Sequence, residues 1–193
     1  MRTYQWEGLP TPKLGDGRLT DTEGIVCYTD GSKIEESPVG FGYLVRSTAS
    51  NHGEHGHIGT HSTVFQGEVF AIQRASNYLQ TLPGNEDINF YVDNQAAILS
   101  LTKPECDSTT VYRCRESLTQ LCRRHKVVIN WVQAHAGFDL NEKVDKLAKL
   151  GTQSDNAHIV PRPLKTSNGK YEKKQPVGGM QGGARSPPAD RQD

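Results

Sequence analysis

"VFQGEVFAIQRASNYL", residues 64–79, combines a clear helical pattern with one residue that does not fit it. Apolar side chains recur at helical spacing along this stretch and just beyond it, as expected for a helix that lies on a core. They are Phe65, Ile72, Ala75, Leu79 and Leu82. Glu68 lies within the same stripe, three residues after Phe65 and four before Ile72. Burying an unpaired carboxylate costs on the order of several kcal/mol, so its position requires an explanation.

The segments around this helix alternate between strand and helix periodicity in a definite order. Three strands joined as hairpins come first, and Thr63 and Gln66 then stand at capping-box spacing at the start of the 64–79 helix. The expected strands are residues 24–32, 39–47, 55–63, 88–93 and 126–135, and the other expected helices are residues 94–101, 108–125 and 141–151. The order βββαβααβα predicts an α/β fold with a five-stranded mixed sheet flanked by helices.

The chain of 193 residues suits one domain with flexible ends. Residues 1–20 are rich in Pro and Gly and lack apolar periodicity, and residues 153–193 hold five Pro and five Gly. We therefore expect a flexible N-terminal segment at 1–20, one domain at 21–152, and a disordered basic tail or linker at 153–193.

Charge and hydropathy restrict the possible partners. The formal net charge is zero, and residues 1–152 carry 15 Lys and Arg against 18 Asp and Glu. A nucleic-acid partner would therefore need a local basic strip or bound cations. No stretch approaches the roughly 20 apolar residues of a membrane span. The first ten residues contain no apolar signal core, so we expect no membrane association, no secretion and an intracellular location.

The cysteines and a histidine cluster have ordinary explanations. Four cysteines, at 27, 106, 114 and 122, form no C-x-x-C pair, and we interpret them as reduced core residues rather than zinc ligands. His52, His55, His57 and His61 lie in the Gly-rich stretch "NHGEHGHIGTHS". Because no second ligand set accompanies them, we interpret this stretch as a polar turn and an edge strand.

Four carboxylates are predicted to face one location. Asp30 ends the first strand, Asp93 ends the 88–93 strand, and Asp145 follows Val144 on the inward face of the last helix. The carboxyl ends of neighbouring strands are where ligands gather in α/β sheets. Each acid alone has an ordinary role, and Asp145 in particular stands four residues before a lysine, at 149.

The set is harder to explain without a metal, because Glu68 has no Lys or Arg three or four residues away. Converging carboxylates would repel one another, whereas Mg²⁺ prefers such oxygen ligands. Two ions about 4 Å apart activate a water, hold a scissile phosphate and stabilise the leaving oxygen. The acids therefore predict metal-dependent phosphodiester hydrolysis without a nucleophilic side chain.

Four stretches together resemble the ribonuclease H family in order and spacing. They are "YTDGS" with Asp30, "FQGEVFAI" with Glu68, "FYVDNQAA" with Asp93, and "WVQAHAGFDLNEKVDKLA" with His135, Asn141 and Asp145. The resemblance covers roughly 130 residues. Within the family, "STVFQGEVFAI" is most similar to ribonuclease H domains of reverse transcriptase polyproteins of the non-LTR retrotransposon type, and the last stretch is also similar to the retroviral version.

The resemblance implies an endonuclease that hydrolyses the RNA strand of RNA–DNA hybrids with two Mg²⁺ ions, for which Mn²⁺ substitutes. Asp30, Glu68, Asp93 and Asp145 would be the metal ligands. His135 would assist proton movement or product release. The substrate-binding residues would be Gln95 at the RNA 2′-hydroxyl and Thr63 at a phosphate, with Asn141 near the site as a structural helix cap. A reverse transcriptase domain in the same polyprotein is the expected protein partner.

Two departures from the family pattern affect substrate binding. Val64 and Phe65 replace polar residues of cellular members. Cellular members also insert a basic, Trp-bearing helix before the last strand, and the 37 residues between Asp93 and Trp131 leave no room for it. What remains is a basic strip, which we expect either to bind the hybrid backbone, chiefly through Arg113, Arg123 and Arg124, or to be a solvated helix face. The strip consists of Arg113, Arg115, Arg123, Arg124 and Lys126.

Two alternatives remain from other classes. A noncatalytic hybrid-binding or connecting module of a reverse transcriptase would keep the fold but would have lost one or more of the four acids, and all four are present. A DNA-cutting nuclease or integrase of the same general fold is disfavoured by the signature from His135 to Asp145.

Overall fold

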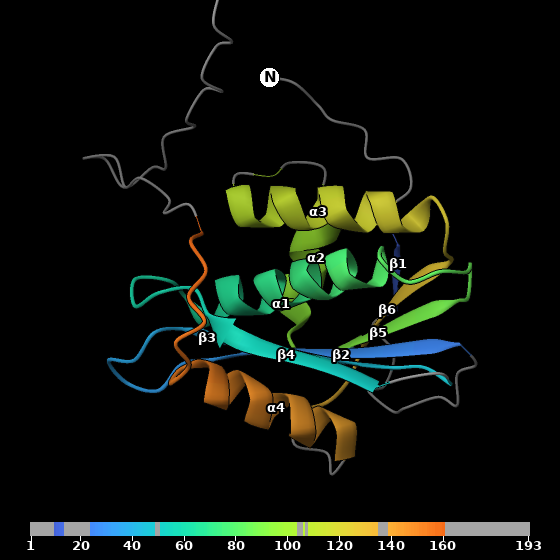
Figure 1. Cartoon of the computed structure of the whole chain (residues 1–193). Helices are drawn as coiled ribbons and strands as arrows, with labels where there is room; N and C mark the ends of the chain where they lie inside the picture. Colours follow the sequence, from blue (N-terminus) through green and yellow to red (C-terminus); the bar gives the residue numbers. More distant parts are fainter. Residues whose placement is uncertain are drawn as a thin grey trace, which may run out of the picture.

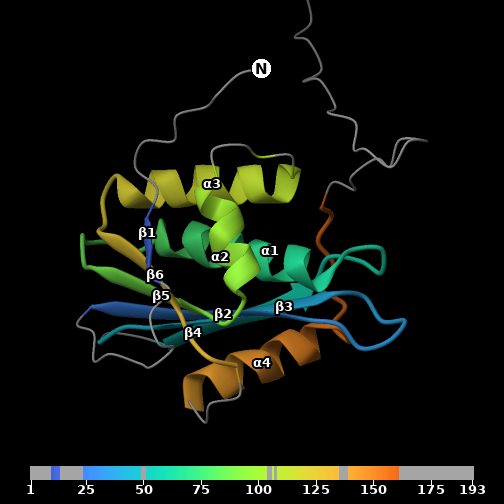
Figure 2. The same cartoon turned by 180° about the vertical axis from the view of Figure 1, so that it is seen from behind.

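The chain forms three layers, with a six-stranded mixed sheet between two layers of helices. The computed structural model describes residues 10–13, 24–48, 51–103, 106, 108–134 and 139–160. Helices α1 (Val64–Leu79), α2 (Gln95–Thr102) and α3 (Thr109–Cys122) cover one face of the sheet, and α4 (Asp139–Gly151) covers the other (Figure 1). The view from behind shows the same layers (Figure 2).

The sheet has the strand order β1-β6-β5-β2-β3-β4. Its central strand β2 is antiparallel to β3 and parallel to β5, β3 is antiparallel to β4, and the remaining pairs, β5 with β6 and β6 with β1, are parallel. The strands are β1 (Thr11–Lys13), β2 (Ile25–Ser32), β3 (Gly40–Arg46), β4 (Asn51–His57), β5 (Ile88–Val92) and β6 (Val127–Trp131). The expected α/β fold with a mixed sheet flanked by helices is confirmed.

Two strands differ from the sequence expectation. β1 adds a sixth strand within the segment predicted to be flexible, and its three residues are too few to show any periodicity. The third strand was expected at 55–63 but lies at Asn51–His57, where it pairs with β3 along its whole length. Its Gly- and His-rich sequence has no apolar alternation, so only pairing with β3 determines its register.

The described structure continues beyond residue 152 as far as residue 160. The segment beyond α4 runs past the end of β4 towards α1 (Figures 1 and 2). His57 N donates to Asn156 O at 3.0 Å, and His158 N donates to His57 O at 2.8 Å, so this segment covers part of the sheet edge. Val160 is buried against a small apolar cluster that includes Phe41 and Phe70. The rest of the predicted tail, residues 161–193, lies outside the described residues.

The main core lies between the sheet and the α1–α3 layer. β2 contributes Ile25 and Cys27 to it, and α1 contributes the stripe predicted from the sequence. A smaller cluster beneath the sheet joins Tyr28 and Tyr91 to Val144 of α4. All four cysteines are free and lie in or against the core, as expected. Among the described residues, no helix is both long and apolar enough to cross a membrane.

Candidate metal centre

Three acidic side chains meet where β2 and β5 end. Asp30 lies near the end of β2, Asp93 directly follows β5, and Glu68 lies in the second turn of α1. One carboxylate oxygen from each lies within 4.8 Å of the others, and this trio is the one candidate metal cluster within the described part of the chain. β2 and β5 are parallel neighbours with Thr29 opposite Val92. The residues that follow these two, Asp30 and Asp93, therefore bring their carboxylates to the same end of the sheet.

The start of α1 and a glycine in β2 together determine the position of Glu68. Thr63 caps the helix, because its hydroxyl accepts a bond from Gln66 N at 3.2 Å while Gln66 Oε1 accepts one from Thr63 N at 3.0 Å. Gly31 lets the helix rest directly on the strand, since a Cβ at this position would lie 2.5 Å from Glu68 N. Glu68 therefore reaches a strand end that a larger residue at 31 would separate from α1.

The trio is poorly suited to holding negative charge by itself. Asp30 is 7% exposed and Glu68 3% exposed. Burial, with the charges of Asp93 and Asp145, raises the pKa of Asp30 to about 7. Burial, with the charges of Asp30 and Asp93, also raises the pKa of Glu68 well above its ordinary value. Within the described residues, the buried Glu68 Oε2 has no hydrogen-bond partner.

This donor set fits a hard divalent cation. It offers carboxylate oxygens alone, which are the ligands of Mg²⁺ rather than of soft transition metals. A divalent cation would give the orphaned Glu68 oxygen a partner and would convert the repulsion within the trio into attraction.

Asp145, the fourth predicted acid, stands apart from the trio. It lies on α4, on the opposite face of the sheet from α1 (Figure 1), and its Oδ2 is 2.7 Å from Lys149 Nζ. α4 approaches β3 closely at Gly42, where a Cβ would lie 2.7 Å from Ala148 N. The charge of Asp145 raises the pKa of Asp30, so the two groups interact. Sequence reasoning treated convergence of four acids and the Asp145–Lys149 pair as alternatives, and the structure combines a converged trio with that pair.

β6 fixes the segment that carries Asp93. Trp131 Nε1 donates to Asp93 O at 3.0 Å, and Val132 N donates to Val92 O at 3.1 Å. Sequence reasoning did not assign Trp131 a role, although it opens the last of the four motifs. Its indole N–H acts on a backbone carbonyl, a contact that no residue pattern reveals.

The other predicted site residues fall into three groups. Gln95 is exposed at the first residue of α2, beyond the cap made by Asn94, and Thr63 is exposed at the cap of α1. Asn141 was expected to cap the last helix, but α4 begins two residues earlier, so its buried side chain lies within the first turn. Its Oδ1 has no hydrogen-bond partner within the described residues. His135 lies outside the described residues.

The predicted basic strip is not a single surface. Arg115 is completely buried, and its Nη2 donates to the carbonyls of Ser100 and Lys103 at the end of α2. Its inclusion in an exposed strip was wrong, because it follows Cys114 on the inward side of α3.

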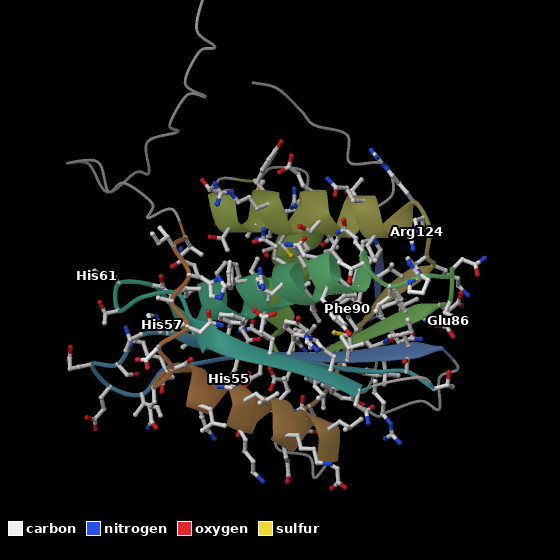
Figure 3. The ribbon with its side chains drawn as sticks, viewed as in Figure 1. His55, His57, His61, Glu86, Phe90 and Arg124 are labelled. Carbon is white, nitrogen blue, oxygen red and sulfur yellow. The ribbon has the colours of Figure 1, made fainter. Side chains whose placement is uncertain are left out.

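The remaining cations of the strip differ in their partners. Arg124 Nη2 donates to Leu82 O at 2.7 Å, and Lys126 pairs with Asp87 at 3.1 Å. Arg124 lies near Glu86 at the end of the molecule opposite His57 and His61 (Figure 3). Because β5 and β6 run in parallel, Arg124 and Lys126 lie at the start of these strands and the acidic trio at the other end. Arg113 and Arg123 are exposed on α3 and at its C-cap.

The histidine-rich stretch forms an edge strand, as expected. His52 stacks on Tyr78 with ring centroids 3.9 Å apart, and its Nε2 lies 3.2 Å from the Tyr43 hydroxyl. His55, His57 and His61 are spread along the strand and the loop after it (Figure 3). None of these histidines belongs to the candidate metal cluster of the described residues.

Comparisons with known proteins bear on the family and the fold. The sequence profile of the family described as RNase H matches residues 22–153. The fold is similar to the crystal structure of RNase H1 from the halophilic archaeon Halobacterium salinarum NRC-1. That match has 21% sequence identity and a TM-score of 0.52, and covers 67% of this chain and 97% of the archaeal one.

Proposed function

Because the chain belongs to the ribonuclease H family, we propose that it is a metal-dependent endonuclease that hydrolyses the RNA strand of RNA–DNA hybrids. The observation that carries this proposal is the trio of Asp30, Glu68 and Asp93, with oxygens within 4.8 Å of one another. The buried and unpartnered Glu68 oxygen supports it further, because a bound divalent cation would give this oxygen a partner and offset the cost of burying the carboxylate.

The four acids would be the ligands of two metal ions. Asp30, Glu68 and Asp93 would hold one Mg²⁺, and Asp145, whose charge already acts on Asp30, would contribute to a second. When bound, two such ions supply Lewis acidity at the attacking water, the scissile phosphate and the leaving oxygen. Mn²⁺ has the same preference for carboxylate oxygens and should substitute. His135, which the family resemblance assigns to proton movement or product release, would complete the set.

Residues at the start of two helices would recognise the hybrid. Gln95 is exposed at the N-terminus of α2, one residue beyond the cap at Asn94 and two residues after Asp93. A contact from Gln95 to a 2′-hydroxyl would distinguish RNA from DNA in the strand to be cut. Thr63, at the cap of α1, would contact a phosphate. Arg113 and Arg123 are the exposed cations of α3 that remain for the hybrid backbone.

We further propose that this is the ribonuclease H domain of a reverse-transcribing element, with a reverse transcriptase domain as its partner. The similarity of "STVFQGEVFAI" to such domains supports this origin. So does the connection from α3 to β6, which consists of residues 123–126 and has no room for a basic helix. The isolated domain would therefore bind hybrid weakly and would act inside the cell, where the partner domain supplies further contacts.

A noncatalytic role within a reverse transcriptase is the second candidate. The observation that favours it is the Asp145–Lys149 ion pair, which occupies one of the four acids. The cleavage experiment below separates the two candidates, because a noncatalytic module would bind hybrid without cutting it.

The experiment is cleavage of a hybrid with a fluorescent RNA strand, in Mg²⁺ and in EDTA. We expect the wild type to cut only the RNA strand and only with the metal. Asp93→Asn should lower turnover about 10³-fold, because ion-mediated stabilisation of several kcal/mol is lost at about 1.4 kcal/mol per factor of ten. Asp87→Asn, an exposed aspartate just before β5, is the matched control and should keep wild-type turnover. Near wild-type turnover in Asp93→Asn would exclude the proposed mechanism.

A further inference from the structure

One lysine is already paired with Asp145, the acid proposed to contribute to the second ion. Lys149 Nζ lies 2.7 Å from Asp145 Oδ2, across one turn of α4. The Asp145 side chain is 24% exposed and that of Lys149 is 50% exposed. Within the described residues, neither Asp30 nor Glu68 forms a salt bridge with a lysine or arginine, whereas Asp145 is paired with Lys149.

Lys149 interacts with more than its helix neighbour. The hydrogen bond to Asp145 and the charges of Asp145 and Asp30 all raise its pKa, although slight burial opposes this. Asp145 in turn acts on Asp30. The ammonium group therefore lies within the electrostatic field of two of the four acids.

The consequence concerns the order in which cations bind. The Asp30, Glu68 and Asp93 oxygens meet without Lys149, so a first divalent ion can bind there and leave the ion pair intact. A second ion that uses Asp145 must take its carboxylate from the ammonium and then remains near a like charge. The two ions should therefore differ in affinity because of this one side chain.

We propose that Lys149 is a built-in competitor for the divalent ion at Asp145, and that it sets the Mg²⁺ concentration at which the second ion binds. This inference rests on the proposed function, since it assumes that the four acids hold two ions. Lys149 acts here through Asp145 and is a positioning residue rather than a catalytic one. The competing explanation is an ordinary ion pair that stabilises α4 alone.

The test is calorimetric titration of Mg²⁺ into the substrate-free protein. Lys149→Met should lower the half-saturating Mg²⁺ concentration of the weaker site about three- to tenfold, the range expected for loss of an exposed ion pair and one nearby like charge. The tighter site should be unchanged. Lys149→Arg keeps the charge and should behave as wild type. Lys146→Met removes an exposed lysine of the same helix that forms no salt bridge among the described residues, and should also leave both sites unchanged.

Each outcome separates the inference from the function beneath it. If Lys149→Met and wild type give superimposable titrations with two sites, the inference is overturned while the metal-dependent function stands. A single Mg²⁺ site in the wild type would also overturn it. If the wild type binds no Mg²⁺, the proposed function itself fails. Melting curves would establish that each variant is folded, and Lys149→Gln provides the same comparison should Met disturb α4.

Discussion

Asparagine at position 30 should make the metal-free protein more stable. The folded protein holds the Asp30 pKa at about 7, against an ordinary value near 3.8, because the carboxyl is buried near Asp93 and Asp145. A pKa difference of one between folded and unfolded states corresponds to about 1.4 kcal/mol, so ionised Asp30 costs the fold at most about 4 kcal/mol above pH 7. Because part of this cost is shared with Glu68, we expect Asp30→Asn to raise the free energy of unfolding by about 2–4 kcal/mol at pH 8.

The pH dependence follows from the direction of that change. Unfolded Asp30 loses its proton near pH 4, whereas folded Asp30 keeps it until about pH 7. Glu68, whose pKa is also raised, contributes a fall of its own. Between about pH 4 and 7 folded Asp30 binds more protons than unfolded Asp30, so its contribution lowers stability as pH rises through this range. Asp30→Asn removes this contribution and should flatten the profile.

Urea unfolding in EDTA at pH 5, 6, 7 and 8 measures both effects. Asp87→Asn is the control, because this exposed residue should change stability by less than about 0.5 kcal/mol. The reasoning would be refuted if Asp30→Asn were less stable than wild type at pH 8. It would equally be refuted if the difference in stability between Asp30→Asn and wild type did not grow between pH 5 and 7.

Three further changes test how the site is built. Gly31→Ala should cost about 1–3 kcal/mol of stability in urea unfolding and weaken Mg²⁺ binding, because its Cβ would lie 2.5 Å from the backbone of α1. Gly53→Ala is the control. Its Cβ would meet side chains at 3.4 Å, so Mg²⁺ binding should stay intact. Trp131→Phe removes the hydrogen bond from the indole N–H to Asp93 O and should cost about 0.5–1.5 kcal/mol in stability. It should also raise the Mg²⁺ concentration needed for half-maximal cleavage. An unchanged Mg²⁺ dependence would exclude a positioning role for Trp131. Affinity for the hybrid should fall as the salt concentration rises. Replacing Arg113 and Arg123 together by Ala should reduce the slope of log affinity against log salt concentration by about 2. An unchanged slope would show that these two arginines do not contact the hybrid.

The sequence predicted the features that depend on local pattern. Thr63 and Gln66 form the expected capping box, and Glu68 lies in the buried stripe of α1 as its spacing indicated. These features depend on contacts within one helix, or on which face of it meets the core. Such information is present in the spacing of residues along the chain.

The features that the sequence missed depend on tertiary packing. β1 is ordered by pairing with β6 rather than by its own three residues, and β4 takes its register from β3. Arg115 looks like a surface residue until α2 is placed, because carbonyls at the end of that helix accept its hydrogen bonds. Whether Asp145 would join the trio or pair with Lys149 depended on how α4 lies against the sheet.

The central claim is that Asp30, Glu68 and Asp93 together hold a divalent cation. Its most direct test is anomalous diffraction from crystals grown in saturating Mn²⁺. We expect a strong anomalous peak within coordinating distance of a carboxylate oxygen from each of the three residues. The claim would be contradicted if the map were empty there while Mn²⁺ bound elsewhere, or if Glu68 had turned away from the other two acids.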